Sequence, residues 1–279
     1  MTAPTTTKPI LSPPSWTARW TPVTHEPTAD EIGTLFDLLT YADIADTIDH
    51  SLLRPELDDA FIADNLRLAA EYEVASVTMR PSDVVRAVAA MKDARVMVGT
   101  VVGFPHGNHL TTTKVFETER ALEQGAHEID MVIQIAALKS GRDQDVEADI
   151  RAVVDVSHVG GAAVKVIFEN AYLSDDEKVR ACRMSEAAGA DFVKTSTGFA
   201  PTGATHEDLI LMRQNTTLPT QVKAAGGVRT LDALLAVMCL GVTRIGATAT
   251  KTILDDFKAR KADAGASPIT TGVLEQGTY

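Results

Sequence analysis

Short runs of β-branched residues alternate with longer stretches rich in Ala, Leu and Glu along most of the chain. The runs are apolar without strict alternation, which is typical of parallel strands covered on both faces. They predict strands at 46–49, 75–79, 96–102, 128–133, 164–168, 192–195, 221–224 and 243–246. The stretches between them predict helices at 57–72, 82–93, 111–125, 143–158, 175–189, 205–215, 230–240 and 249–260.

Eight strands, each followed by a helix, indicate an α/β protein with the (β/α)8 architecture of a TIM barrel. An extra helix at about 29–45 precedes the first strand, and Thr28, Ser174 and Thr230 stand where capping residues begin helices. The alternative is a doubly wound sheet. Its dinucleotide-binding form carries GxGxxG after an early strand, and this sequence contains no such motif.

The two ends of the chain differ from this pattern. Residues 1–27 contain six of the twelve prolines, which predicts an extended or disordered arm because proline blocks helix formation. Trp16 and Trp20 lie in this arm, so we expect it to cover a surface of its own barrel or of a partner subunit. Residues 28–262 then form a single barrel domain, and residues 263–279 form a polar tail.

Composition narrows the classes of partner. Lys and Arg number 26 against 38 Asp and Glu, which gives a net charge of −12. This excess of acid argues against a nucleic-acid or anionic-membrane partner. We expect no membrane span and no secretory signal, because apolar runs of the needed length are absent from the sequence. Cys182 and Cys239 are far apart and outside any CxxC pattern, which favours a reducing cytoplasm.

Charged residues inside apolar strands draw attention because burying a charge is unfavourable unless it is paired or used. Four charged residues within or at the end of predicted strands stand out: Asp130, Lys165, Lys194 and Lys223. Lys165 has a simple alternative, in which its ammonium reaches solvent or pairs with a nearby carboxylate. Lys194 and Lys223 end neighbouring strands, so we expect them to share the mouth of the barrel.

Two neighbouring, partly buried ammonium groups repel each other, and burial also disfavours the charged form. An uncharged lysine amine attacks carbonyl carbon and forms a Schiff base. A carboxylate such as Asp130 could then move protons around the reacting carbon. This combination indicates class I aldolase chemistry, which needs neither metal nor cofactor.

Glycine-rich segments follow the last two strands. Ala224–Gly227 comes after the seventh strand, and Ile245–Thr250 leads from the eighth strand into a helix. Glycine allows a ligand close to the backbone, and N–H groups at a helix start favour phosphate. Barrels often bind phosphate at these loops, to which Thr195–Gly198 could add hydroxyl groups. The alternative is that these glycines only form tight turns.

Several motifs, in order and at fixed spacing, resemble the deoxyribose-phosphate aldolase family between about Ile48 and Thr252. The matching segments are IDHSLLRP (48–55), VGFPHG (102–107), HEIDMVIQIAALKSG (127–141), VKVIFEN (164–170), AGADFVKTSTGF (188–199), VKAAGGVRT (222–230) and RIGAT (244–248). The most specific of them is KTSTGF.

The resemblance implies a reaction and assigns roles. The reaction is reversible cleavage of 2-deoxy-D-ribose 5-phosphate to acetaldehyde and D-glyceraldehyde 3-phosphate. Lys194 would form the Schiff base, Lys223 would favour its uncharged form, and Asp130 would relay protons through water. The phosphate contacts would come from Thr197, Gly198, Gly226, Gly227 and Thr248. Independently of the resemblance, Asp49 and Lys165 are expected to support the lysine pair from behind; the alternative for Asp49 is a helix or loop cap.

Some positions depart from the family pattern. Gln134 stands where Asn is usual, Thr78 where Cys is common, and Thr248–Ala249 supplies one hydroxyl where two serines are common. Two alternatives therefore stay open. One is a paralogous Schiff-base lyase acting on a related or non-phosphorylated aldol. The other is a catalytically silent barrel that binds a sugar phosphate, although unused buried charges would destabilise it. The tryptophan-bearing arm also suggests a homo-oligomer.

Overall fold

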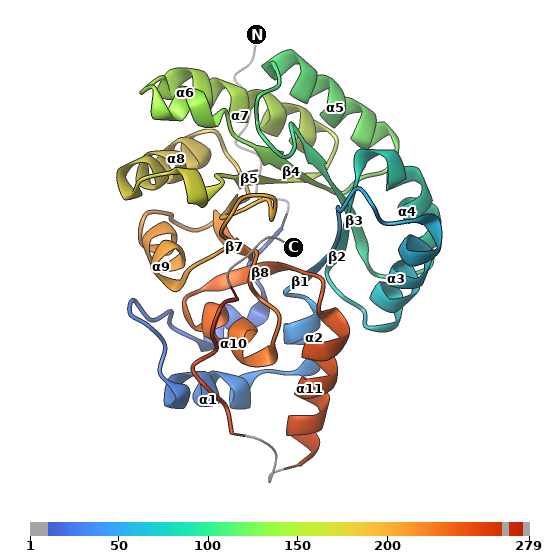
Figure 1. Cartoon of the computed structure of the whole chain (residues 1–279), viewed down its shortest axis with the longest axis vertical. Helices are drawn as coiled ribbons and strands as arrows, with labels where there is room; N and C mark the ends of the chain where they lie inside the picture. Colours follow the sequence, from blue (N-terminus) through green and yellow to red (C-terminus); the bar gives the residue numbers. More distant parts are fainter. Residues whose placement is uncertain (1–10, 264–267, 276–279) are drawn as a thin grey trace.

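Eight parallel strands close into one barrel in the computed structural model, which describes residues 11–263 and 268–275 (Figure 1). Each strand pairs with the next along the chain, and β8 pairs with β1. The strands are β1 (Ile48–Leu52), β2 (Ser76–Met79), β3 (Met97–Val102), β4 (Glu128–Val132), β5 (Ala163–Ile167), β6 (Phe192–Lys194), β7 (Gln221–Ala225) and β8 (Val242–Ala247). The predicted TIM barrel is confirmed.

The helices surround this barrel, as Figure 1 shows. They are α1 (Ala29–Leu38), α2 (Tyr41–Ala45), α3 (Asp59–Glu71), α4 (Val84–Ala90), α5 (Thr111–Glu123), α6 (Ile135–Lys139), α7 (Asp143–Val159), α8 (Asp175–Ala187), α9 (His206–Gln214), α10 (Leu231–Cys239) and α11 (Thr250–Ala262). The expected caps are present: Thr28 and Ser174 each form a capping box, and the Thr230 hydroxyl accepts a hydrogen bond from the Ala233 N–H.

The segment before β1 differs from its prediction. The single helix expected at 29–45 is two helices, because Leu39 is extended and Thr40 begins α2 with a capping box of its own to Asp43. Asp46 is the C-cap of α2, so β1 begins at Ile48, two residues later than predicted. The short helix α6 was also not predicted, since five residues carry too little periodicity to be recognised.

The described part of the N-terminal arm packs on its own barrel. It contains a 3₁₀ helix, η1 (Ser15–Arg19), in which Trp16 is 1% exposed. The Trp20 indole N–H donates to the Cys239 carbonyl at 3.1 Å, and the Gln221 amide donates to the Leu11 carbonyl at 2.9 Å. Because Gln221 is the first residue of β7, the arm crosses the end of the barrel where the strands begin. Residues 1–10 lie outside the described residues.

The described part of the C-terminal tail, residues 268–275, also lies against the barrel. Leu274 is buried, and the Glu275 N–H donates to the Gly227 carbonyl at 3.1 Å. The tail therefore borders the glycine loop that follows β7. Residues 264–267 and 276–279 are outside the described residues. Among the described helices, none combines the length and the apolar character that a membrane span requires.

Candidate active site

Strand alternation turns the charged side chains into the barrel. On β4, Ile129 and Met131 belong to the hydrophobic core between sheet and helices. Glu128 and Asp130 occupy the alternate positions and therefore point to the opposite face, which is the barrel interior. On β5 the same rule places Val164 and Val166 in the core and the residue between them inside. The interior of this barrel therefore carries charge.

These inward side chains form one group, called here the barrel-interior cluster. Its side chains are at most 7% exposed, and each is within ion-pair distance of at least one other member. The members are Asp49 (β1), Glu128 and Asp130 (β4), Lys165 (β5), Lys194 (β6), Lys223 (β7) and Arg244 (β8). The cluster thus holds three carboxylates and four basic groups.

Asp130 brings the two predicted lysines together. Lys194 and Lys223 lie directly opposite each other in the β6–β7 register. The Lys194 Nζ is 2.7 Å and the Lys223 Nζ 2.9 Å from the same oxygen, Oδ2 of Asp130. The other oxygen, Oδ1, accepts from Lys165 at 3.0 Å. A single carboxylate therefore contacts three ammonium groups.

Three further residues complete the cluster beyond Lys223 and Lys165: Asp49, Glu128 and Arg244. The Lys223 Nζ is 2.5 Å from Asp49, and the Lys165 Nζ is 2.5 Å from Glu128. Arg244 pairs with both carboxylates, with Asp49 through one guanidinium nitrogen and with Glu128 through the other at 2.8 Å. Asp49 and Lys165 thus lie behind the Lys194–Lys223 pair, where they were expected.

The ion pairs counteract burial for most of these groups. Burial alone would raise the pKa of Asp130, but Lys165, Lys194 and Lys223 hold it well below its usual range. Burial would likewise lower the pKa of Lys165, but Asp130, Asp49 and Glu128 raise it. Both groups are therefore charged throughout the ordinary pH range.

Lys223 behaves differently, because its pKa is lowered. Burial is the largest cause, and the positive charges of Lys194 and Lys165 act in the same direction. Asp130 and Asp49 oppose the shift without overcoming it. The sequence predicted that burial and repulsion between two ammonium groups would act together on this lysine pair; for Lys223, burial contributes more than the repulsion.

Sequence reasoning missed two members of the cluster, Glu128 and Arg244. Both lie inside predicted strands and are charged, so the rule that singled out Asp130 applies to them equally. Glu128 belongs to the EIDMVI segment and Arg244 to the RIGAT segment. Applying the rule to every charged strand residue would have found them.

The predicted phosphate loops line one cavity beside the cluster. Its lining includes Gly198, Gly226, Gly227 and Thr248, together with Arg229. All lie at or after the ends of β6, β7 and β8. Gly226 and Gly227 have positive φ angles of 79° and 100°, which strongly favour glycine. A Cβ on Gly226 would also lie 2.8 Å from the Gly203 Cα.

Thr197 is the exception among the predicted phosphate residues, because it does not line this cavity. Its hydroxyl donates to Glu169, and its backbone N–H donates to the same carboxylate at 3.1 Å. Glu169 is buried, and burial raises its pKa despite these two hydrogen bonds. The Thr197 hydroxyl therefore orders the loop after β6.

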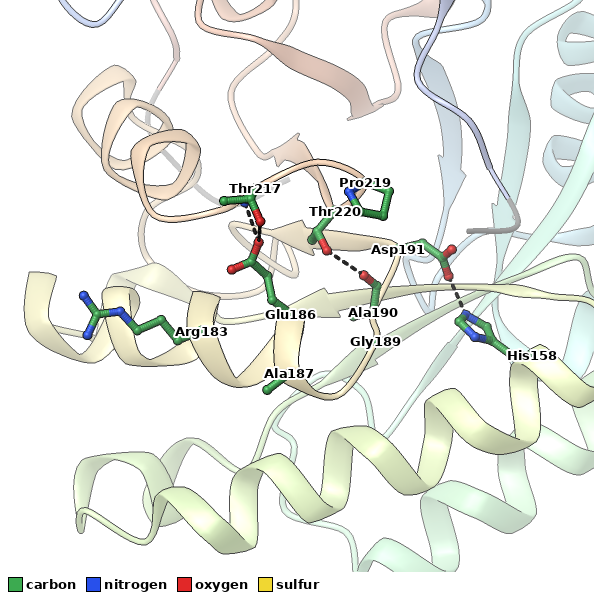
Figure 2. A pocket seen from close by; sticks show the side chains of 10 residues that line it. All are labelled: His158, Arg183, Glu186, Ala187, Gly189, Ala190, Asp191, Thr217, Pro219 and Thr220. Atoms are coloured by element: carbon green, nitrogen blue, oxygen red, sulfur yellow. Dashed lines mark hydrogen bonds and ion pairs between the residues drawn. The ribbon is translucent and has the colours of Figure 1, made fainter. Parts of the chain in front are cut away.

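A separate cavity of about 460 Å³, drawn in Figure 2, lies at the end of the barrel where the strands begin, away from the glycine-lined cavity. His158, Asp191 and Thr220 help to line it, and His158 pairs with Asp191 at 2.8 Å. Asp191 precedes β6, whereas Lys194 ends that strand. This cavity is therefore separate from the barrel-interior cluster. Within residues 11–263 and 268–275, no group of three His, Cys, Asp or Glu side chains is placed to hold a metal ion.

The arrangement can support amine chemistry on a carbonyl compound. Lys194 is 3% exposed and ends its strand, at the end of a barrel where active sites form. A carboxylate and a second amine adjoin it, and the glycine-lined cavity lies at the same end of the barrel, after the ends of β6, β7 and β8. A phosphorylated aldehyde or ketone could therefore place its carbonyl at the amine and its phosphate at the glycines.

Comparisons with known proteins agree with this description. The sequence profile of the DeoC/LacD family aldolases matches residues 45–259. Deoxyribose-phosphate aldolase 2 of Bacillus licheniformis is 48% identical over 220 residues, which span 79% of this chain and 98% of that protein. The deoxyribose-phosphate aldolase of Bacillus subtilis is also 48% identical over 220 residues, with the same coverage. A tetrameric deoxyribose phosphate aldolase from Aeropyrum pernix has a TM-score of 0.76 and 29% identity, covering 84% of this chain and 99% of that one.

Proposed function

The chain belongs to the DeoC/LacD family of aldolases, and from this premise we infer that it is a class I aldolase. It reversibly cleaves 2-deoxy-D-ribose 5-phosphate to acetaldehyde and D-glyceraldehyde 3-phosphate. The reaction breaks a carbon–carbon bond and releases an aldehyde, so the enzyme is an aldehyde-lyase. The observation that carries this function is the convergence of Lys194 and Lys223 on one oxygen of Asp130.

Lys194 is the proposed nucleophile. Its uncharged amine attacks C1 of the open-chain sugar, and loss of water gives an iminium ion. The C2–C3 bond then breaks while the C3 hydroxyl loses its proton, and the bonding electrons flow to the iminium nitrogen. D-Glyceraldehyde 3-phosphate leaves first. Protonation of the remaining enamine at carbon, followed by hydrolysis, releases acetaldehyde and restores the amine.

Asp130 and Lys223 support this sequence. Asp130 stays ionised because three lysines hold its pKa low, so it can orient both amines and a water that carries protons. Lys223, whose pKa is lowered by burial, supplies a second amine at the same oxygen. Asp49 holds Lys223 from behind at 2.5 Å. Lys165 holds Asp130 at 3.0 Å.

The glycine-lined cavity is the proposed phosphate site. Gly226 and Gly227 allow the phosphate to approach the backbone, and the α11 N-terminus follows Thr248 within two residues. Gly198 and Thr248 complete the lining. Thr197 contributes indirectly, since its hydroxyl is bonded to Glu169. A phosphorylated substrate is therefore favoured over the free sugar.

Reductive trapping tests the mechanism directly. Borohydride added with acetaldehyde should attach an ethyl group to the peptide that contains Lys194, as read by mass spectrometry. The matched control is Lys139→Ala, which removes a half-exposed lysine on α6 and should leave the adduct unchanged. An adduct confined to other lysines, or none, would remove Lys194 as the nucleophile.

A substrate panel separates the remaining alternatives. Equal turnover of 2-deoxy-D-ribose and its 5-phosphate would favour a paralogous lyase for non-phosphorylated aldols. Ligand-induced thermal stabilisation without turnover would favour a silent sugar-phosphate-binding barrel. The expected result is turnover that is much faster with the phosphorylated sugar.

Assembly and compartment are further proposals. We propose a homo-oligomer, supported by the tetramer of the Aeropyrum pernix relative, and light scattering of the purified chain tests it. We also propose the reducing cytoplasm as the compartment, because Cys182 and Cys239 are free and buried.

A further inference from the structure

The barrel-interior cluster contains more basic groups than acidic ones. With every member ionised, Lys165, Lys194, Lys223 and Arg244 face only Asp49, Glu128 and Asp130, a surplus of one positive charge. Within the described residues, no fourth carboxylate lies within ion-pair distance of these cations. A buried, uncompensated charge is strongly unfavourable, so the cluster is most stable when one basic group is neutral.

The contacts show which groups can be neutral. Arg244 cannot lose its proton in a protein, and its pKa is raised further by Asp49 and Glu128 despite burial. Lys165 contacts three carboxylates, at 2.5, 3.0 and 3.5 Å. Lys223 contacts two carboxylates, whereas Lys194 contacts only the oxygen it shares with Lys223. The surplus proton therefore belongs to the Lys194–Lys223 pair.

Lys194 is the member of that pair that can reach substrate. Its side chain is 4% exposed, whereas the Lys223 side chain is fully buried. It also contacts a single carboxylate, Asp130, whereas Lys223 contacts both Asp49 and Asp130.

We propose that Arg244 and Glu128 are positioning residues whose opposite charges fix the number of protons on the Lys194–Lys223 pair at one, and so set the pH range in which Lys194 is a nucleophile. The proposal rests on the proposed aldolase function and extends it to residues that touch no substrate. Arg244 and Glu128 contact each other at 2.8 Å and reach the pair only through Asp49 and Lys165.

Other charges near the pair are accounted for. Asp49 on β1, Asp130 on β4 and Lys165 on β5 contact it or its partners. Glu169, after β5, is within the electrostatic reach of Lys194, yet it binds Thr197 and its pKa is raised by burial. It therefore does not balance the surplus. On β2 the inward-facing residues Ser76 and Thr78 are buried and uncharged, and on β3 the inward positions belong to Gly99 and Val101, which carry no charge either.

Three variants test the charge count: Arg244→Met, Glu128→Gln and the double variant. Arg244→Met leaves three basic groups against three carboxylates, so both lysines can hold protons and the reactive amine should appear at higher pH. Glu128→Gln leaves four against two, so the amine should appear at lower pH. The double variant leaves three against two and should return towards wild type.

The measurement is the pH dependence of borohydride-trapped acetaldehyde adduct on Lys194, together with the acid limb of the kcat/KM profile. We expect shifts of about one pH unit in opposite directions for the two single variants. Shifts in the same direction, or a double variant that moves further from wild type than either single one, would overturn the proposal. A purely structural role would lower the amplitude without opposite shifts.

A variant that fails to fold, and a failure of the proposed function, can each be told apart from a failure of the charge count. If Arg244→Met does not fold, Glu128→Gln, which keeps the side-chain shape, and Arg244→Lys, which keeps the charge, decide the question. The first must lower the midpoint pH, and the second must leave it unchanged. Wild-type protein without an adduct on Lys194 would refute the proposed function. A normal adduct whose pH dependence is unchanged by these substitutions would refute only the charge count.

Discussion

Two groups of buried charges lie on opposite sides of the barrel wall. Inside is the barrel-interior cluster. Outside, beneath α5 and α7, Lys114 and Asp149 form a pair at 2.5 Å in which both side chains are 0% exposed. Lys114 also donates to the Val132 carbonyl at 2.8 Å, and Asp149 accepts from the Thr111 hydroxyl at 2.7 Å.

The two groups differ in their charge count and in their access to the mouth of the barrel. The Lys114–Asp149 pair is balanced, and the Gln134 amide gives Asp149 a further hydrogen bond at 3.2 Å. The cluster has a surplus of one cation, and the Lys194 amine contacts a single carboxylate oxygen, Oδ2 of Asp130, which it shares with Lys223. Burial lowers the pKa of both Lys114 and Lys223, so the direction of that shift does not distinguish a structural lysine from a catalytic one. The charge count of the surrounding group distinguishes them.

The largest expected effect comes from removing the reactive amine. Lys194→Met should lower kcat/KM by on the order of 10⁴-fold or more, because it removes the proposed Schiff-base amine. It also removes the surplus charge, so the thermal midpoint should stay the same or rise. Steady-state aldehyde release and thermal unfolding check both parts. Retained turnover, or loss of activity only through unfolding, would mean that the barrel-interior cluster is structural, like the Lys114–Asp149 pair.

Lys114→Met should affect stability and leave the chemistry intact. The substitution leaves Asp149 buried and without its cation, which should lower the free energy of unfolding by about 3–5 kcal/mol. Urea unfolding measures this loss, and the kcat of the folded fraction should change little. The matched control is Lys114→Met combined with Asp149→Leu, which should recover much of the stability. A catalytic defect in a fully folded variant would show that this pair is more than structural.

The sequence singled out the proposed reacting lysines but not every charged residue around them. Lys194 and Lys223 were recognisable because a cation in a short apolar strand is rare, and the β6–β7 register then made them neighbours. Arg244 and Glu128 are 116 residues apart in the chain, and only closure of the barrel brings β8 and β4 across its interior. Local patterns carry no information about such cross-barrel contacts.

The same limit explains the other differences. Thr197 belongs to the TSTG segment, but only the backbone path after β6 directs its hydroxyl to Glu169 instead of to the glycine-lined cavity. The break at Leu39 was recoverable, because Thr40 and Asp43 form the same kind of capping box as Thr28 and Glu31. Tertiary contacts determine the position of the Thr197 hydroxyl, whereas the break at Leu39 follows from a local signal in the sequence.

His50 shows a third solution, a buried titratable group that avoids charge. Its ring bonds to the Thr250 hydroxyl at 2.8 Å and the Asn65 amide oxygen at 3.1 Å, and burial lowers its pKa to about 4 from 6.5. Between those values the unfolded chain binds a proton that the folded protein does not, so stability is full above pH 6.5 and falls towards pH 4. The loss should reach roughly 3 kcal/mol.

Urea midpoints at pH 7 and pH 4.5 measure this loss, with His50→Gln as the comparison. The glutamine cannot titrate, so its midpoint should fall less between the two pH values than that of the wild type. Equal falls in both proteins would mean that His50 is not the group responsible.

Thr248→Val should have the smallest effect, because it removes one hydroxyl from the glycine-lined cavity and no charge from either group. Loss of a single hydrogen bond to phosphate should raise KM for 2-deoxy-D-ribose 5-phosphate by about tenfold. The KM for the free sugar should not change, since that substrate has no phosphate to bind. The pH profile should also stay as in wild type, because the cluster and its charge balance are untouched. Equal changes for both sugars would place Thr248 near the reacting carbon, and the phosphate would then bind elsewhere.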